Sequence, residues 1–150
     1  MKNTDRIEKQ ILLRASKSRV WRALTDADEF GAWFRVKLEG RFAVGQRIRG
    51  KITYPGYEHL TMDVTVERMD EEKLFSFRWH PDALDPKVDY SKEPTTLIEF
   101  RLEEAEGGTR LTVSESGFDQ LPPERRETAF RDNEKGWSVQ MENIKRHVAG

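Results

Sequence analysis

Cysteine is absent from the 150-residue chain, and histidine occurs only three times. The lack of cysteine excludes disulfide scaffolds, thiol redox chemistry, cysteine nucleophiles and every zinc site that needs thiolate. His59, His80 and His147 are never three or four positions apart, so the chain has no helical pair of metal-binding histidines. We interpret His80, Asp82 and Asp85 as parts of a solvated loop rather than a cation site. We therefore expect no metal centre and no cofactor.

Long hydrophobic runs and an excess of one charge are also missing. No apolar run approaches the roughly 18 residues that a membrane span requires, and the first residues lack the apolar core of a signal peptide. The 26 basic and 27 acidic residues leave a formal net charge of -1, which argues against nucleic acid or a membrane surface as a partner. We expect one domain over residues 1–150, located in the cytoplasm.

Aromatic and β-branched residues are plentiful, and they recur with a period of two in five segments. Such alternation is typical of half-buried antiparallel strands. A turn of hairpin length at residues 106–108 separates the last two segments. In the first segment, Tyr54 shares a face with Ile48 and Ile52. The five predicted strands cover residues 47–54, 59–69, 74–80, 96–102 and 109–115.

Helices are predicted near both ends of the chain. Ser16 is a candidate N-cap for a short helix, and residues 25–28 resemble a capping box that opens a second short helix. The longest helix is predicted over about residues 122–148, where apolar side chains form a stripe at helical spacing. Gly136 inside it costs about 1 kcal/mol relative to alanine. We expect this glycine to let the helix approach a neighbouring element closely.

The order of these elements predicts an α+β fold. One strand precedes two short helices, about six strands follow, and one long helix ends the chain. An antiparallel sheet has one face to bury, and the long amphipathic helix is available to cover it. We predict a curved antiparallel sheet of about seven strands that grips the C-terminal helix. A cavity often remains between such a sheet and its helix, and the long loop at residues 81–94 is a candidate lid.

Four segments in the same order resemble the START-like helix-grip (SRPBCC) superfamily. They are VWRALTD at residues 20–26 followed by Trp33-Phe34, PTTLIEF at residues 94–100, GGTRLTVSESGF at residues 107–118, and NEKGW at residues 133–137 with Met141 downstream. Within the superfamily, the chain is most similar to the group related to the activator of the ninety-kilodalton heat-shock protein ATPase, from about residue 7 to 148. The resemblance implies a seven-stranded antiparallel sheet around the last helix. Because the superfamily includes lipid carriers, hormone receptors, cyclases and co-chaperones, it implies no single activity.

Glu115 is the most notable ionisable residue. The alternation of Leu111 and Val113 extends to it and places its carboxylate on the inner face of the sheet. A buried carboxylate is costly unless it is paired or neutralised, and burial raises its pKa as a general acid or base requires. We predict that Glu115 lies in or at the rim of a cavity. The alternative is that Ser116-Gly117 begins a bulge or turn, which would leave Glu115 in solvent.

Inward aromatic residues are individually typical of a plain core, but together they favour an apolar pocket with a few polar groups. Tyr54, Trp79 and Trp137 each combine an apolar ring with one donor, which suits them to orient a flat ligand. Methionine side chains adapt to ligand shape. The predicted ligand pocket contains Trp33, Tyr54, Met62, Phe77, Trp79, Phe100, Glu115, Phe118, Trp137 and Met141.

A basic segment at residues 35–51 has six basic residues and one acidic residue. It is either a patch for an acidic protein partner or, as we prefer, part of the solvent face of the sheet. On that face, cross-strand pairs of Arg47, Arg49 and Lys51 with Asp63 and Glu67 would contribute roughly 0.2–1 kcal/mol each.

We predict that the protein binds a small apolar or aromatic ligand in the cavity between the sheet and the C-terminal helix. A protein-interaction module of the co-chaperone type, active in the stress response as a homodimer or with another protein, is the first alternative. A cavity enzyme of cyclase or hydrolase type that uses Glu115 and Tyr54 is the second, and we favour binding over catalysis. An open cavity with buried polar groups favours binding or catalysis, whereas a filled core with an exposed apolar patch favours protein interaction. Catalysis also requires two polar groups that converge on one point.

Overall fold

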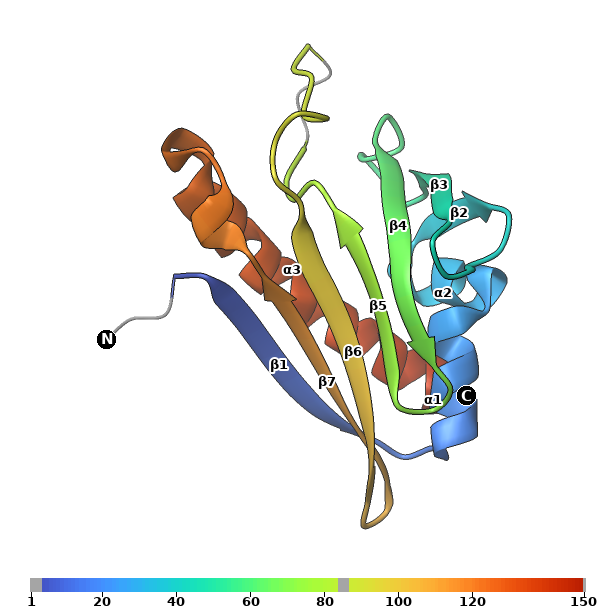
Figure 1. Cartoon of the computed structure of the whole chain (residues 1–150). Coiled ribbons are helices and arrows are strands. Elements are labelled where there is room, and N and C mark those ends of the chain that lie inside the picture. Colours follow the sequence, from blue (N-terminus) through green and yellow to red (C-terminus); the bar gives the residue numbers. More distant parts are fainter. Residues whose placement is uncertain (1–3, 84–86, 150) are drawn as a thin grey trace.

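The computed structural model describes residues 4–83 and 87–149, and Figure 1 shows the order of its elements. The structure has a first strand, two short helices, six further strands and a long last helix that follows one 3-10 turn. The elements are β1 (Arg6–Leu13), α1 (Lys17–Thr25), α2 (Ala27–Phe34), β2 (Val36–Glu39), β3 (Arg47–Ile52), β4 (Thr61–Asp70), β5 (Leu74–Trp79), β6 (Thr96–Ala105), β7 (Gly108–Ser116), η1 (Phe118–Gln120) and α3 (Pro123–Ala149).

All seven strands form one antiparallel sheet in the order β1-β7-β6-β5-β4-β3-β2. Each pair that is adjacent in sequence from β2 to β7 is also adjacent in the sheet, while β1 closes the far edge against β7. In Figure 1 the sheet curves and α3 crosses its concave side, with α2 beside β2 and α1 next to α2. The predicted α+β class, the number of strands and the grip of the sheet on the last helix are confirmed.

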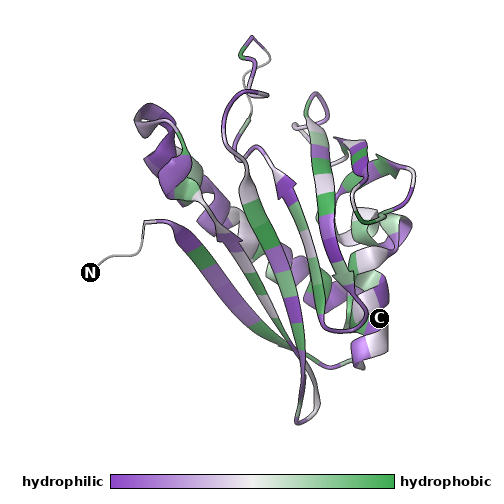
Figure 2. Ribbon diagram, viewed as in Figure 1, coloured by the Kyte–Doolittle hydropathy of each residue, from purple (hydrophilic) through white to green (hydrophobic). Residues whose placement is uncertain are grey.

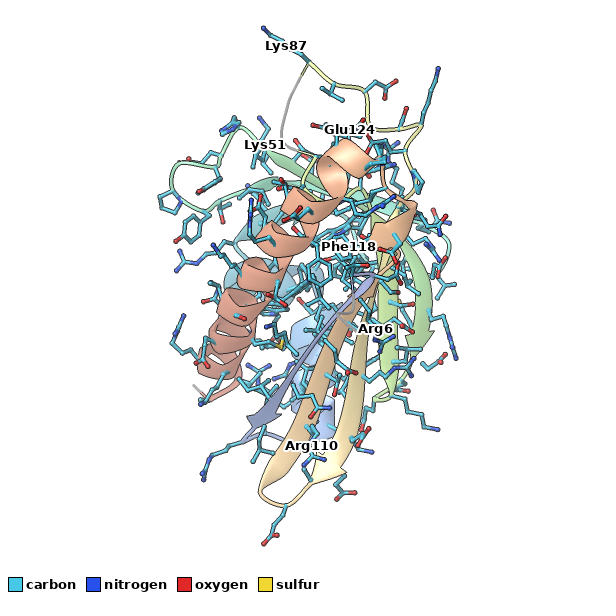
Figure 3. All side chains as sticks on the ribbon, turned by 90° about the vertical axis from the view of Figure 1, so that its left-hand side faces the viewer. Arg6, Lys51, Lys87, Arg110, Phe118 and Glu124 are labelled. Carbon is cyan, nitrogen blue, oxygen red and sulfur yellow. The ribbon has the colours of Figure 1, made fainter. Side chains whose placement is uncertain are left out.

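The alternation along the strands separates the two faces of the sheet. Figure 2 shows hydrophobic and hydrophilic residues in alternate bands along β6 and its neighbours. In Figure 3, Arg110 lies at the outer surface whereas Phe118 lies between the sheet and α3. Burial of the apolar face against α3 removes large rings from water. Each Å² of apolar surface that is buried stabilises the fold by about 25 cal/mol, and this gain drives the packing of the two layers.

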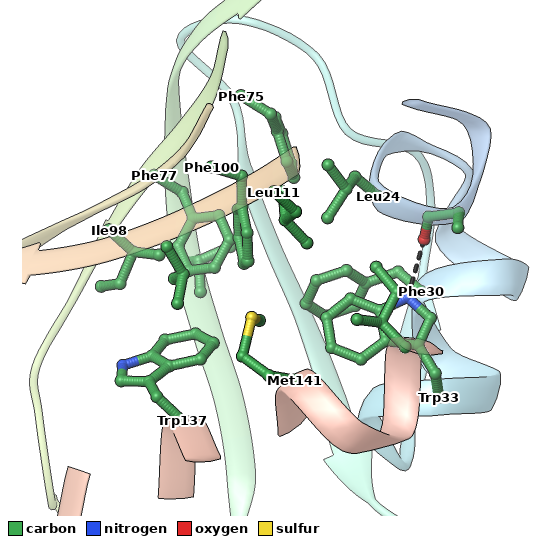
Figure 4. Packing of buried hydrophobic residues seen from close by; sticks show 14 of the residues in the cluster. Leu24, Phe30, Trp33, Phe75, Phe77, Ile98, Phe100, Leu111, Trp137 and Met141 are labelled. Carbon is green, nitrogen blue, oxygen red and sulfur yellow. Dashed lines mark hydrogen bonds between the residues drawn. The ribbon is translucent and has the colours of Figure 1, made fainter. Parts of the chain in front are cut away.

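The core contains a cluster of aromatic rings, part of which Figure 4 shows. Phe75, Phe77 and Phe100 are fully buried on adjacent strands, and the rings of Phe75 and Phe100 stack with their centroids 6.1 Å apart. Trp33 from α2 packs edge-on against Phe100, and its indole N–H donates a hydrogen bond to the Ala23 carbonyl at 2.8 Å. This bond satisfies the one polar atom of the ring, so Trp33 fits a dry core.

The long helix follows the predicted stripe. Trp137, Met141 and Ile144 are buried along it, at spacings of four and three residues. No described helix is both long enough and apolar enough to cross a membrane. The expectation for Gly136 was wrong, because a Cβ atom at this position would meet nothing within 4 Å. The helix therefore makes no close contact there.

The helix caps follow the sequence with one correction. The Ser16 hydroxyl accepts a hydrogen bond from the Arg19 amide at 3.2 Å, as an N-cap of α1 should. The predicted capping box at residues 25–28 does not form, and a simple N-cap one residue later replaces it, with Asp26 Oδ1 accepting from the amides of Asp28 and Glu29. Asp26 is the N-cap of α2, whereas Thr25 still belongs to α1 and its hydroxyl donates to the Trp21 carbonyl. Aspartate is at least as good an N-cap as threonine, which explains the shift.

Two further predictions about β3 and its surroundings were only partly right. The strand ends at Ile52, and Tyr54 lies in the following loop, where its ring packs against Tyr57 at 5.6 Å between centroids. On the outer face, Arg47 forms an ion pair with Asp63 as predicted. Glu67 does not pair with this basic segment, because Arg78 binds it from β5 at 2.7 Å.

The partly buried carboxylate of Glu29 connects the three helices through hydrogen bonds. Glu29 of α2 accepts hydrogen bonds from Arg19 at 2.6 Å and Arg22 at 2.7 Å, both on α1, and lies 3.0 Å from His147 Nε2 on α3. Burial alone would raise the pKa of Glu29, but the hydrogen bonds from His147, Arg19 and Arg22 together lower it below its ordinary value. The ionised form is therefore the one that stabilises the fold.

The substitution Glu29→Gln should lower the free energy of unfolding by about 1–2 kcal/mol at pH 7, because three donors lose a charged acceptor. A pKa lowered in the folded state contributes stability that is present above the ordinary value of 4.5 and is lost as the pH falls through the folded value. The difference between variant and parent should therefore shrink below pH 4.5, as measured by urea unfolding. The exposed control Glu142→Gln should show no such difference, and a pH-independent gap would contradict this account.

Candidate functional site

A cavity of about 430 Å³ lies where β4 and β5 separate. Pairing between these strands begins only at Thr65, opposite Arg78, so the first residues of β4 and the segment after Trp79 diverge. The space between them is walled by Phe34, Arg47, Ile52, Leu60, Thr61, Met62, Asp63, Trp79, His80, Asp82, Ala83, Tyr90, Ser91 and Asn133. A break in strand pairing therefore creates the cavity.

A smaller pocket of about 100 Å³ adjoins it on the side of α3. Phe34, Trp79 and Asn133 belong to the walls of both spaces. Gly136 and Trp137 form the floor of the smaller one, where the missing side chain of the glycine leaves room. The open space thus extends from the diverging strands to the surface of the long helix.

Parallel indole rings form the wall between the two spaces and the core. Trp79 of β5 and Trp137 of α3 stack with 5.8 Å between centroids and an interplanar angle of 22°. Phe34, at the end of α2, lies 6.2 Å from Trp79 and 6.3 Å from Trp137. Three elements therefore contribute rings to one apolar surface, which is the kind of lining that small-molecule sites use.

Glu115 lies directly behind this wall. Its Cα pairs with Ile7 of β1 and Ile98 of β6, and its side chain is fully buried between the sheet and α3. The strand continues to Ser116, so the alternation does extend through Glu115 and the side chain faces inward. The carboxylate is not part of either cavity wall, but it contacts residues that are.

Four side chains donate hydrogen bonds to the Glu115 carboxylate. The Trp79 indole N–H and the Thr96 hydroxyl reach Oε2 at 2.8 and 2.5 Å. The Trp137 indole N–H reaches Oε1 at 2.8 Å, and the Asn133 amide reaches both oxygens at 3.0 and 3.1 Å. The donors come from β5, β6 and two positions of α3 one turn apart, so one carboxylate joins both layers of the fold.

The electrostatics of Glu115 are set by two opposing effects. Burial raises its pKa, while the hydrogen bonds from Thr96, Trp79, Trp137 and Asn133 oppose that rise. An indole N–H can only donate, so both carboxylate oxygens must serve as acceptors. Among the described residues, no cationic side chain forms an ion pair with Glu115, and neutral donors alone hold it.

Asp82 carries a second perturbed carboxyl group, at the rim of the cavity. Burial, a hydrogen bond with Asp132 of α3 and repulsion by that residue raise its pKa to about 6, Arg125 lowers it and Glu115 adds to the rise. Asp82 has a backbone φ of 53°, a conformation that aspartate and asparagine tolerate better than most residues. Its carboxyl group therefore changes charge near neutral pH.

Arg125, in the first turns of α3, holds the loop that carries Asp82. Its guanidinium donates to the carbonyls of Pro81 and Asp82 at 2.9 and 3.1 Å and to the Glu93 carboxylate at 3.0 Å. It also lies 4.7 Å from the centre of the Tyr90 ring, in cation–π geometry. Both described ends of the loop at residues 81–94 are thus attached to the long helix.

The structure distributes the predicted pocket residues over three environments. Met62 and Trp79 line the large cavity, Trp137 lines the small pocket and Glu115 lies behind the wall. Tyr54 is 47% exposed in its loop and does not approach the fully buried Glu115, so the pair proposed for catalysis does not converge. The remaining predicted residues are buried in the core: Trp33, Phe77, Phe100, Phe118 and Met141.

Several wall residues were not predicted. Asn133 carried a readable signal, since it is a polar residue within the apolar stripe of α3, and such a residue usually has a buried partner. Phe34 and Tyr90 carried none that is specific to a cavity. For the cation site considered at His80, the ring Nε2 lies 3.1 Å from the Glu93 carbonyl, Asp85 lies outside the described residues, and the described residues contain no metal-binding cluster.

A curved antiparallel sheet closed around a long C-terminal helix, with a cavity beside that helix, defines a helix-grip protein. More specifically, the chain belongs to the family of Activator of Hsp90 ATPase homolog 1-like proteins, which it matches over residues 14–149. The predicted family is thereby confirmed. No curated protein matches the chain.

Solved structures show the same fold at low sequence identity. Protein MLL2253 from Mesorhizobium loti is 22% identical with a TM-score of 0.76, and the alignment covers 96% of each chain. The Aha1 dimer from Colwellia psychrerythraea is 20% identical with a TM-score of 0.70, covering 95% of each chain. DynU16, from the dynemicin biosynthetic locus, is 20% identical with a TM-score of 0.75, covering 97% of this chain and 47% of that one.

Glu115→Gln should lower the free energy of unfolding by about 2–4 kcal/mol, because an amide nitrogen would face an indole N–H that has no other acceptor. Urea unfolding followed by circular dichroism measures the loss. Glu103→Gln, on the exposed part of β6, is the matched control and should change stability by less than about 0.5 kcal/mol. Equal effects of the two substitutions would show that the four donors do not depend on the carboxylate.

Proposed function

We propose that the protein binds a small apolar or aromatic ligand in the cavity beside α3, in the cytoplasm. The observation that carries this proposal is the cavity itself, about 430 Å³ in volume and walled by rings and aliphatic side chains together with polar residues. Pockets of roughly 300–1,000 Å³ with such a lining are the usual sites of small ligands. Membership of the family supports the expectation of a cavity, and the residues of this chain determine how that cavity is lined.

The wall is rigid, which favours binding. Hydrogen bonds to Glu115 fix the planes of Trp79 and Trp137 and the amide of Asn133. A ligand that enters therefore loses little free energy to ordering of protein side chains, which is a major cost of association. We favour binding over catalysis because the described cavity lining brings no nucleophile and base together.

A protein-interaction module of the co-chaperone type, in the stress response, is the second candidate. Tyr54 and Tyr57 support it, since their rings pack together on an exposed loop and are 47% and 51% accessible. Paired exposed tyrosines are typical of protein interfaces. The relative from Colwellia psychrerythraea is described as a dimer, so a homodimer is the first partner to test.

Titration with 1-naphthylmethanol tests the leading proposal. Calorimetry should show saturable binding with one site, and the melting temperature should rise with probe concentration because the probe binds only the folded state. Thr61→Phe places a ring in the cavity wall and should weaken binding by about tenfold or more. Thr65→Phe, at an equivalent exposed position of the same strand outside the cavity, is the control. No binding by the parent, or equal weakening in both variants, would exclude the cavity as the site.

A further inference from the structure

Two polar side chains of the cavity wall, Trp79 and Asn133, use their N–H donors elsewhere, and Asn133 keeps an acceptor free. The N–H groups of Trp79 and Asn133 are both directed to Glu115, behind the wall. Because the Asn133 nitrogen faces a carboxylate, its Oδ1 is the branch that points away, and no described group donates to it. Asn133 therefore offers a ligand an acceptor, whereas the N–H groups of Trp79 and Asn133 are bound behind the wall.

The charged groups at the cavity also favour a positively charged ligand, because the basic side chains are paired with acceptors while Asp82 lies beside another acid. Arg47 is neutralised by two hydrogen bonds to Asp63. Arg125 is occupied by two backbone carbonyls and the Glu93 carboxylate. Asp82, by contrast, meets another acid, Asp132 of α3, and the buried carboxylate of Glu115 adds to the negative potential around it.

Aromatic faces complete the site. Trp79 and Phe34 line the cavity that Asp82 borders, and so does Tyr90, whose ring already has Arg125 in cation–π geometry. The face of an aromatic ring is negative, so a cation held near such rings is attracted to them, most strongly where water is excluded. Rings, an amide oxygen and a carboxyl group that Arg125 only partly compensates together favour a cationic ligand.

We propose that the ligand of this cavity is an organic cation, namely an aromatic or amphipathic amine whose ring packs on Trp79 and whose ammonium group is bound by Asp82 and by Asn133 Oδ1. This inference rests on the proposed function and names its ligand class. An ammonium group has only donors, so it complements acceptors that the fold leaves open. It also adds positive charge beside Asp82 and Asp132, whose effect on Asp82 Arg125 only partly offsets.

The bound cation should also displace a proton. Asp82 is faced by Asp132 and Arg125 from α3 and by Glu115 from β7, with His80 and Glu93 on its own segment. Its pKa of about 6 means that the carboxyl group is largely protonated at pH 5, and a cation favours the ionised form. Affinity for an amine should therefore rise from pH 5 to pH 7, whereas affinity for a neutral analogue should stay constant.

Three probes with one ring system separate charge from apolar contact. They are 1-naphthylmethylamine, which is cationic, 1-naphthylmethanol, which is neutral, and 1-naphthaleneacetate, which is anionic. Calorimetry at pH 7 should give about tenfold tighter binding of the amine than of the alcohol, and the weakest binding for the acetate. The same titrations at pH 5 should reduce the advantage of the amine.

Asp82→Asn should weaken binding of the amine by about tenfold and change that of the alcohol less than about twofold. Asparagine tolerates the positive φ at this position, so the variant keeps the loop conformation, as circular dichroism can verify. Glu127→Gln removes the same charge from the exposed surface of α3 and should change neither affinity. Asp132→Asn provides a second test, because loss of the acidic neighbour should shift the pH midpoint of amine binding below 6.

The outcomes distinguish the two proposals. Binding of the alcohol with no gain for the amine, or tightest binding of the acetate, overturns the cationic ligand and leaves the proposed function standing. Failure of all three probes overturns both. Preference for the amine that survives in Asp82→Asn but falls in Glu127→Gln places the cation elsewhere and also overturns the inference.

Discussion

The fold depends on the carboxylate of Glu115, which is buried in the core and accepts hydrogen bonds from four neutral side chains. Glu115 joins β7 to β5, β6 and α3, so it acts where the curved sheet meets the helix that it surrounds. Apolar packing alone would let α3 slide or rotate against the sheet, because it has no preferred direction. Hydrogen bonds from Asn133 and Trp137 do have a direction, and they determine which face of the helix is turned inward.

The same interaction decides the chemistry of the cavity. A donor that binds Glu115 is no longer available to a ligand, so the wall presents ring faces, an amide oxygen and the carboxyl group of Asp82. In Trp79, Trp137 and Asn133, the N–H groups bind Glu115 while another part of the side chain borders the open space. One hydrogen-bond network therefore influences both the packing of α3 on the sheet and the groups that border the cavity.

Most of the fold could be read from the sequence, but only part of the site. Period-two alternation depends on burial of one face, so it correctly predicted the strands and the inward direction of Glu115. The cavity exists because β4 and β5 are paired only from Thr65 onward. The residue at which pairing of two strands begins produces no recognisable pattern in the sequence of either strand. For that reason Tyr54 was placed in the pocket although β3 ends before it, and Phe34 and Asp82 were missed. Asn133 was also missed, although a polar residue in an apolar stripe is a signal that can be seen in the sequence.

Substitution of Gly136 would affect both the smaller pocket and the stability of α3. A side chain there would enter the smaller pocket without a clash, and it would also replace the residue that is least favourable in the middle of a helix apart from proline. At most functional positions, a change in specificity has to be weighed against a loss of stability. At Gly136, a side chain that fills part of the smaller pocket also strengthens the helix, so the open space beside α3 can shrink while stability rises.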